Sequence, residues 1–254
     1  MFLYFIGRVL FFVLILFETG AEARIFNMAQ ATFGAYLRGT YAPGPYENTL
    51  NSESNGNNVT LNSDYQYNMS GEFGFSFAKP FGNIRIGLEY LRPPDGKDAS
   101  GTYGGAEAYT LTSEISVLVP KAELEINLKK WQASKVYLLG GIGYASLVAR
   151  NSYTVTAAGT AQFGLSDFSE DIRGNTVMYE GGFGFESVMS DMTTFIVEAG
   201  YRSLKFETVE HNREAVNFQG SVSQHDRATN MDGTSRTLDM SGGFAAFGFR
   251  FWIK

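Results

Sequence analysis

The chain has 254 residues, a formal net charge of −6, 18% charged residues and no cysteine. The negative charge disfavours nucleic acid as a partner, and the lack of cysteine excludes disulfides and thiolate metal sites. Its 29 glycines, 22 phenylalanines and 14 tyrosines are unusual for a soluble domain of this length and indicate an apolar environment for the aromatic rings.

Residues 1–23 have the features of a secretory signal peptide. Arg8 supplies a positive charge, residues 9–17 form an unbroken apolar run, and Ala21-Glu22-Ala23 fits a small-x-small cleavage site. The apolar run is too short for a spanning helix, which needs roughly 20 residues. We expect cleavage directed by Ala21 and Ala23, which leaves a single domain over residues 24–254.

Alternation of apolar and polar residues dominates the rest of the chain. A first strand is expected at residues 32–41. From Tyr65 to Phe77 one face is aromatic and apolar and the other polar, and the pattern resumes at Ile84 after the Lys79-Pro80-Phe81-Gly82 turn. Two alternating strands joined by a tight turn predict an antiparallel hairpin.

Short turns and long polar segments follow one another along the sequence. Further short turns are expected at residues 129–132 and 186–193, and the last strand at residues 240–253. The long segments are rich in Asn, Ser, Gly, Thr and Asp and belong on one watery side. Three short turns and four long segments join eight strands; the long segments are residues 42–63, 92–108, 150–175 and 203–238.

Two segments leave the strand count open. Residues 109–129 alternate throughout, but the apolar phase changes at Pro120, which we interpret as a bulge in one long strand. A turn there would change the count. Residues 215–222 also alternate and form either a projecting ribbon or an extra hairpin. Ten strands therefore remain an alternative to eight.

The polar face separates a membrane barrel from a soluble sandwich. A sandwich exposes Lys, Glu and Thr to water, whereas this face carries Gly, Ser, Asn and isolated charges that suit a narrow lumen. We expect inward glycines to relieve crowding at Gly74, Gly87, Gly140, Gly182, Gly184, Gly200 and Gly248. Strand-end aromatics are expected to form two interfacial girdles: Tyr41, Tyr65, Tyr67, Phe77, Phe81, Tyr90, Trp131 and Trp252.

Over residues 31–253 this pattern resembles the OmpA-like and OmpX-like small outer-membrane barrels. The closing Gly248-x-x-Phe251-x-Ile253 resembles the C-terminal signal read by the outer-membrane assembly machinery, although the chain ends on Lys254 rather than an aromatic residue. The resemblance implies an all-β, antiparallel up-and-down transmembrane barrel in the bacterial outer membrane. Its turns would be periplasmic and its long loops extracellular, and lipopolysaccharide and the assembly machinery would be its partners.

Charges on the inward face are the most specific feature of the sequence. Arg38, Glu72, Glu89 and Glu198 fall near one level, and we predict that Arg38 and Arg202 pair with these carboxylates and plug the lumen. A gate or narrow conduit is the alternative. The inward set comprises Arg38, Glu72, Arg85, Glu89, Glu114, Glu180, Glu198, Arg202 and Arg250.

Catalysis has little support in the sequence. The two histidines, His211 and His225, lie in the last long segment, and neither begins the His-x-Ser-Asn pattern of lipid A deacylases. We predict no enzyme activity, cofactor or metal. The expected function is that of a surface or structural barrel whose loops contact the environment, host or neighbouring cells. A narrow porin-like channel is the alternative, and an outer-leaflet lipid enzyme comes third.

Overall fold

The computed structural model describes residues 33–46, 65–93, 96–218, 220–229 and 234–253. The expected signal peptide, residues 1–23, lies outside the described residues, so its cleavage stays a prediction. Among the described residues, no helix has both the length and the apolar character to cross a membrane.

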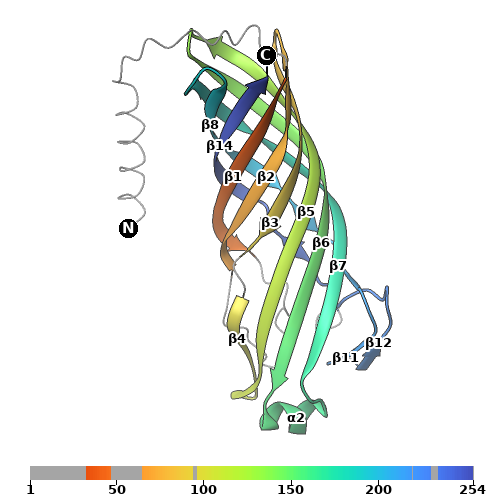
Figure 1. Ribbon diagram of the computed structural model, residues 1–254. Helices are drawn as coiled ribbons and strands as arrows, with labels where there is room; N and C mark the ends of the chain where they lie inside the picture. The colour runs from red at the N-terminus through yellow and green to blue at the C-terminus, as the bar shows by residue number, and fades with distance from the viewer. Residues whose placement is uncertain (1–32, 47–64, 94–95, 219, 230–233, 254) are drawn as a thin grey trace.

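Eight antiparallel strands form a closed ring (Figure 1). Each strand pairs with a neighbour on both sides, and the β7–β8 pairing closes the sheet. The predicted eight-stranded barrel is confirmed. The strands of the ring are β1 (Phe33–Tyr46), β2 (Tyr65–Lys79), β3 (Gly82–Arg92), β5 (Ala106–Lys130), β6 (Ser134–Val155), β7 (Phe168–Val188), β8 (Thr193–Ser203) and β14 (Gly242–Ile253).

Three strands run far beyond the others. β5, β6 and β7 contain 25, 22 and 21 residues, against 11 in β3 and in β8, and they project from the ring on the side of the long loops (Figure 1). We call this projecting part the extension. It also contains β4 (Gly96–Tyr103), α2 (Ala157–Phe163), β9 (Lys205–Phe206), β10 (Glu210–His211), β11 (Ala215–Asn217), β12 (Gly220–Val222) and β13 (Leu238–Asp239).

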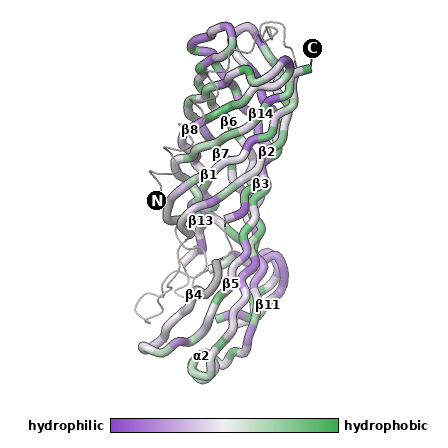
Figure 2. The backbone as a smooth tube through the Cα atoms, turned by 60° about the vertical axis from the view of Figure 1, so that its left-hand side comes forward, coloured by the Kyte–Doolittle hydropathy of each residue, from purple (hydrophilic) through white to green (hydrophobic). Residues whose placement is uncertain are grey.

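The extension settles the second open segment of the sequence. β11 and β12 pair only with each other, so residues 215–222 form a projecting ribbon rather than two more strands of the ring. β4 pairs with β5 above the ring, and β10 pairs with β7. Figure 2 shows hydrophilic residues around β11, in contrast to the apolar stretches of the ring strands.

An apolar belt covers the outside of the ring. On each ring strand, alternate side chains point outward, and the large apolar ones among them are exposed. A soluble protein of this size does not expose so much contiguous apolar surface, whereas lipid requires it. Examples from around the ring are Leu37, Phe73, Ile86, Leu124, Ile142, Tyr179, Val197 and Phe247.

The interpretation of Pro120 as a bulge was wrong. Odd-numbered residues of β5 are buried without a break from Tyr109 to Glu125, and the register with β6 is the same on both sides of Pro120. The pairing of β5 continues unchanged through Pro120, and what changes there is the surroundings of the two faces of the strand. Below Pro120 the outward face is apolar, as at Ala122 and Leu124, and above it the inward face is apolar, as at Val117.

The predicted direction of three side chains was also wrong: Glu114 and Gly140 face outward instead of inward, and Trp252 faces inward instead of outward. Glu114 is exposed on the outside of β5, because the extension meets water there. Gly140 points outward, and a Cβ at this position would meet nothing within 4 Å. Trp252 points into the barrel, where it packs against Ala78 and Val188. It therefore does not belong to the girdle of exposed aromatic residues.

Candidate functional site

The lumen of the ring is filled by charged side chains. Among the described residues, six cations and seven carboxylates lie there within ion-pair distance of one another, and all are buried. Burying a lone charge is costly, so each needs a partner. The cations are Arg38, Arg85, Lys121, Lys135, Arg202 and Arg250, and the carboxylates are Glu72, Glu89, Glu123, Glu125, Glu180, Glu186 and Glu198.

The first layer lies nearest to the short turns. Arg250 on β14 contacts Glu125 on β5 at 2.5 Å and Glu186 on β7 at 2.6 Å. Lys135 on β6 contacts the same two carboxylates at 3.4 and 2.9 Å. Two cations thereby connect four strands across the lumen.

The middle layer converges on one carboxylate. Glu198 on β8 accepts hydrogen bonds from Arg38 Nη1 at 2.5 Å, Arg85 Nη1 at 2.7 Å and the Tyr137 hydroxyl at 2.6 Å. Arg85 also contacts Glu123 at 2.7 Å. Charge-assisted bonds to one carboxylate from β1, β3 and β6 hold opposite walls of the ring together.

The upper layer is organised by a lysine. Lys121 Nζ lies 2.8 Å from Glu180, 2.9 Å from Glu72 and 3.0 Å from Glu89. Arg202 on β8 contacts Glu89 at 2.6 Å. These contacts extend the network from the first layer to the level at which the inward faces of the strands become apolar.

Inward glycines make room for two buried tyrosines in this network. A Cβ on Gly87 would lie 2.3 Å from the Tyr36 hydroxyl, and one on Gly184 would lie 2.2 Å from the Tyr137 ring. The Tyr36 hydroxyl donates to Glu72. A ring of eight strands has space for such side chains only where the facing residue has none.

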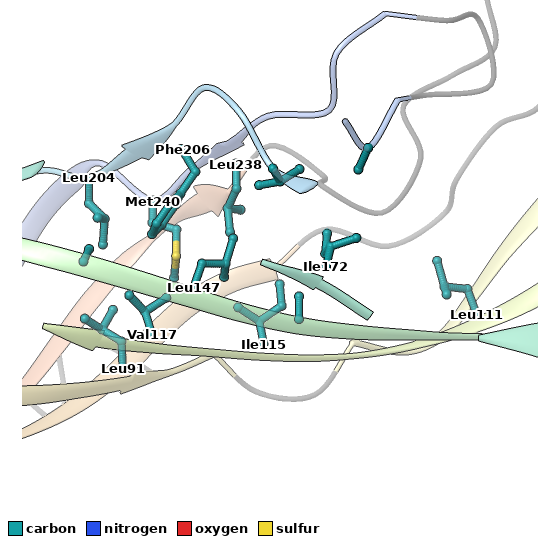
Figure 3. Packing of buried hydrophobic residues seen from close by; sticks show 14 of the residues in the cluster. Leu91, Leu111, Ile115, Val117, Leu147, Ile172, Leu204, Phe206, Leu238 and Met240 are labelled. Atoms are coloured by element: carbon teal, nitrogen blue, oxygen red, sulfur yellow. The ribbon is translucent and has the colours of Figure 1, made fainter. Parts of the chain in front are cut away.

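An apolar cluster lies above the charges. Side chains from β5 and β6, including Val117 and Leu147, pack against Leu204, Phe206 and Met240, which come from the last long loop and its margins (Figure 3). All of them are buried. Side chains of the last loop therefore pack into the apolar interior above the ionic network.

The comparisons with known proteins agree with this architecture. No protein-family model and no curated sequence matches the chain. A major outer membrane protein of Thermus thermophilus is similar in structure, with a TM-score of 0.51 and 10% identity, over 87% of this chain and 99% of that one. This likeness shows the fold. The protein is a small β-barrel of the outer-membrane type.

Two other solved structures have lower scores. OprG of Pseudomonas aeruginosa has a TM-score of 0.46 and 13% identity, over 88% of this chain and 96% of its own. Ail, the attachment invasion locus protein of Yersinia pestis, has a TM-score of 0.42 and 9% identity, over 88% and 100%. In barrels of this type the short turns face the periplasm and the long loops face the exterior.

The outer-membrane barrel brings together every member of the predicted lumen set except Glu114. Arg38, for example, lies 2.5 Å from both Glu72 and Glu198. Sequence reasoning did not name Lys121, Glu123, Glu125, Lys135 or Glu186 as members. The strict alternation of β5, in which Lys121, Glu123 and Glu125 oppose an apolar face, is the signal that would have found three of them.

Residues of the predicted assembly signal lie on β14. Phe251 and Ile253 are exposed on the outside of the barrel, and Gly248 faces inward beside Arg38, to which it is paired in the β1–β14 ladder. Recognition of these three residues by the outer-membrane assembly machinery stays a prediction. Lys254 lies outside the described residues.

The extension is held together by aromatic rings from three long loops. Tyr153 stacks on Phe168 with ring centroids 4.5 Å apart, and Phe218 lies within 5.5 Å of both Tyr109 and Phe163. Edge-to-face and offset pairs of this kind stabilise beyond their buried area. Tyr103, in the loop that follows β3, lies 5.5 Å from Phe163 between ring centroids. The described parts of the loops that follow β3, β6 and β8 therefore pack against one another.

A buried ion pair fastens the last loop to β7. Arg236 Nη1 lies 2.9 Å from Glu170, which also accepts a hydrogen bond of 2.8 Å from Asn217. Burial raises the pKa of Glu170, but the Arg236 charge and these hydrogen bonds outweigh it and lower the pKa below its ordinary value. Burial lowers the pKa of nearby His211, against the opposing effect of Glu170.

The two histidines occupy different environments in the extension. His211 is buried on β10, whereas His225 is exposed and contacts Arg173 and Glu210. In the part of the chain that the structure describes, no group of three or more acidic or histidine side chains is placed to hold a metal ion. The absence of enzyme activity and of a cofactor stays a prediction.

Proposed function

We propose that this outer-membrane barrel is a non-conducting surface protein whose rigid extracellular extension presents a binding face to the environment or to other cells. The observation that supports the proposal is the filling of the barrel interior at two levels, by the buried ionic network and by the buried apolar cluster above it. An interior of eight strands is only wide enough for side chains, and here they fill it at both levels.

The extension supports the second half of the proposal. The described parts of its loops pack against one another, because the aromatic cluster and the Arg236–Glu170 pair connect them to β5, β6 and β7. A surface that is ordered before binding loses less entropy when a ligand binds. Long loops held on a rigid scaffold are also where binding functions concentrate.

Conductance in planar lipid bilayers tests the closure. We expect no steady conductance from the parent, from Arg38→Ala or from Glu72→Ala, because the apolar cluster remains in each. We also expect none when residues 205–239 alone are replaced by a short Gly-Ser linker, which is feasible because Met240 N donates to Leu204 O at 2.8 Å.

Combining the linker with Arg38→Ala removes the last-loop part of the apolar cluster and weakens the middle layer of the ionic network. Seven carboxylates would then face five cations, and any current should be carried by cations. A large porin in the same bilayers is the positive control, and heat-modifiable gel migration verifies that each variant is folded. Steady large conductance from the parent would establish the channel alternative and refute the plug.

A further inference from the structure

A hollow of about 260 Å³ lies on the outer surface of the barrel at the top of the apolar belt. It forms where β3 ends at Arg92 while β5, β6 and β7 continue upward. Its walls come from the four neighbouring strands β3, β5, β6 and β7 and from Asn212 of the last loop. The residues that the argument uses are Tyr90, Arg92, Glu114, Val148, Arg150 and Asp171.

Apolar side chains lie directly below the arginines of this hollow. Tyr90 precedes Arg92 by two residues on β3, and Val148 precedes Arg150 by two residues on β6, so each pair shares the outward face of its strand. Both apolar side chains are exposed, at 48% and 51%. Leu118 on β5, exposed beside Ser146, and then Tyr144 on β6 continue the apolar strip toward the belt. A ligand here meets apolar surface first and guanidinium groups immediately above it.

The charges above the strip are held in a fixed arrangement. Asp171 contacts Arg150 Nε at 2.9 Å and Arg213 Nε at 3.1 Å. Arg150 uses Nε and Nη2 on this carboxylate, and its side chain is still 58% exposed. The lining of the hollow itself carries two guanidinium groups, Arg92 and Arg150, and two carboxylates, Glu114 and Asp171. Arg213, which contacts Asp171 from beside the hollow, adds a third guanidinium group and gives the cluster one excess positive charge in a protein that is negative overall.

We propose that this hollow binds the headgroup of a phosphorylated glycolipid of the outer leaflet, the lipid A part of lipopolysaccharide. Arg92 and Arg150 contact a headgroup phosphate, and the acyl chains lie along Tyr90, Val148 and Tyr144. Planar guanidinium groups bind phosphate through paired hydrogen bonds. The site does not depend on whether the loops bind a ligand or the lumen conducts.

The position of the hollow favours a lipid over a soluble anion. It lies outside the barrel, at the height where outward residues change from apolar to charged, which is the interface between acyl chains and headgroups. The outward face continues upward with hydroxyl groups at Thr112 and Ser152, which are paired across β5 and β6 and suit contact with sugar. A soluble anion would use none of the apolar strip.

Binding to the full chain refolded in detergent, followed by native mass spectrometry, tests the proposal. The probes are bisphosphorylated lipid A, the same lipid with its phosphates removed, and inorganic phosphate, all in EDTA so that divalent cations cannot bridge the carboxylates. We expect the parent to bind bisphosphorylated lipid A, to bind the dephosphorylated lipid about tenfold or more weakly, and not to release lipid A to inorganic phosphate.

Arg92→Gln with Arg150→Gln should weaken binding of bisphosphorylated lipid A by about tenfold or more and leave binding of the dephosphorylated lipid unchanged. The matched control is Lys129→Gln with Lys130→Gln, which removes the same charge at the periplasmic turn and should bind like the parent. Equal binding of both lipids by the parent, loss of binding in EDTA, displacement by inorganic phosphate, or an unchanged affinity in the arginine variant would each overturn the proposal.

Discussion

The packing of the lumen depends on individual inward-facing atoms, such as the Tyr36 hydroxyl and the Cβ that Gly87 lacks. Because a Cβ on Gly87 would lie 2.3 Å from the Tyr36 hydroxyl, Gly87→Ala should destabilise the barrel by about 1–3 kcal/mol through overpacking. Tyr36→Phe alone should cost about 1 kcal/mol, since Glu72 loses its hydroxyl donor. The free energy of unfolding in urea, measured in lipid vesicles, gives both values.

The double variant tests the contact itself. Removing the hydroxyl removes the closest contact, although Glu72 Oε1 would still lie 2.8 Å from the new Cβ, so Tyr36→Phe with Gly87→Ala should cost less than the sum of the single changes. Gly140→Ala is the matched control, because a Cβ there meets nothing within 4 Å and the stability should not change. Simple additivity of the two inward substitutions would contradict this account of the lumen.

Whether a side chain points into the barrel or outward could be predicted wherever one face of its strand was apolar and the other polar. Phe73 and Glu72 are clear examples, since they lie on opposite faces of β2 within the belt. Gly140 could not be placed, because Gly141 follows it and glycine carries no polarity. Glu114 was placed wrongly, because a charge was assumed to face inward at every height, whereas the extension has water outside and apolar side chains inside.

At the scale of elements, the wrong prediction of a bulge at Pro120 has the same cause, the assumption that the inward face is polar at every height of a strand. A bulge and a change of environment both shift the apolar phase along a strand, and sequence alone does not separate them. The shift reflects a change on the inward face of β5, which carries charges below Pro120 and apolar side chains such as Val117 above it. The return of that loop into the mouth could not be foreseen, because its apolar residues are scattered among polar ones.

The packing of the last loop should weaken in mild acid. The pKa values of His211 and Glu170 are both lowered in the folded extension, so the unfolded loop binds protons more readily. Their contribution to stability is present above the ordinary values of 6.5 and 4.5 and is lost as the pH falls, first for His211 and then for Glu170.

Hydrogen exchange of backbone amides measures this loss. The amides of His211 and Ala228 donate within the loop at 2.8 Å, to Asp226 and Val209, and should exchange faster at pH 5.5 than at pH 7.5 after correction for intrinsic rates. His211→Gln should remove the difference between these two pH values. Amides of the β1–β14 ladder serve as the internal reference. Equal protection of the loop at both pH values would contradict the assignment.

Over the whole molecule, closure and filling act together. A closed ring leaves no unpaired strand edge, which is why a sheet can lie in lipid. The ionic layers then connect opposite walls, so the ring cannot flatten or open at one seam without exposing buried charges such as Arg85 and Glu198. Unfolding should therefore require the whole barrel to open at once rather than strand by strand.

This cooperativity predicts heat-modifiable migration on gels. Extracted in mild detergent, the protein should migrate as a compact, fast species with a strand-rich circular dichroism spectrum, and boiling should convert it in one step to a slower species. Arg250→Met removes the shortest ion pair of Glu125 and of Glu186 and should lower the conversion temperature, whereas Lys129→Gln, at the exposed turn, should not. A protein that is soluble without detergent, or one whose mobility is unchanged by boiling, would refute a closed barrel in a membrane.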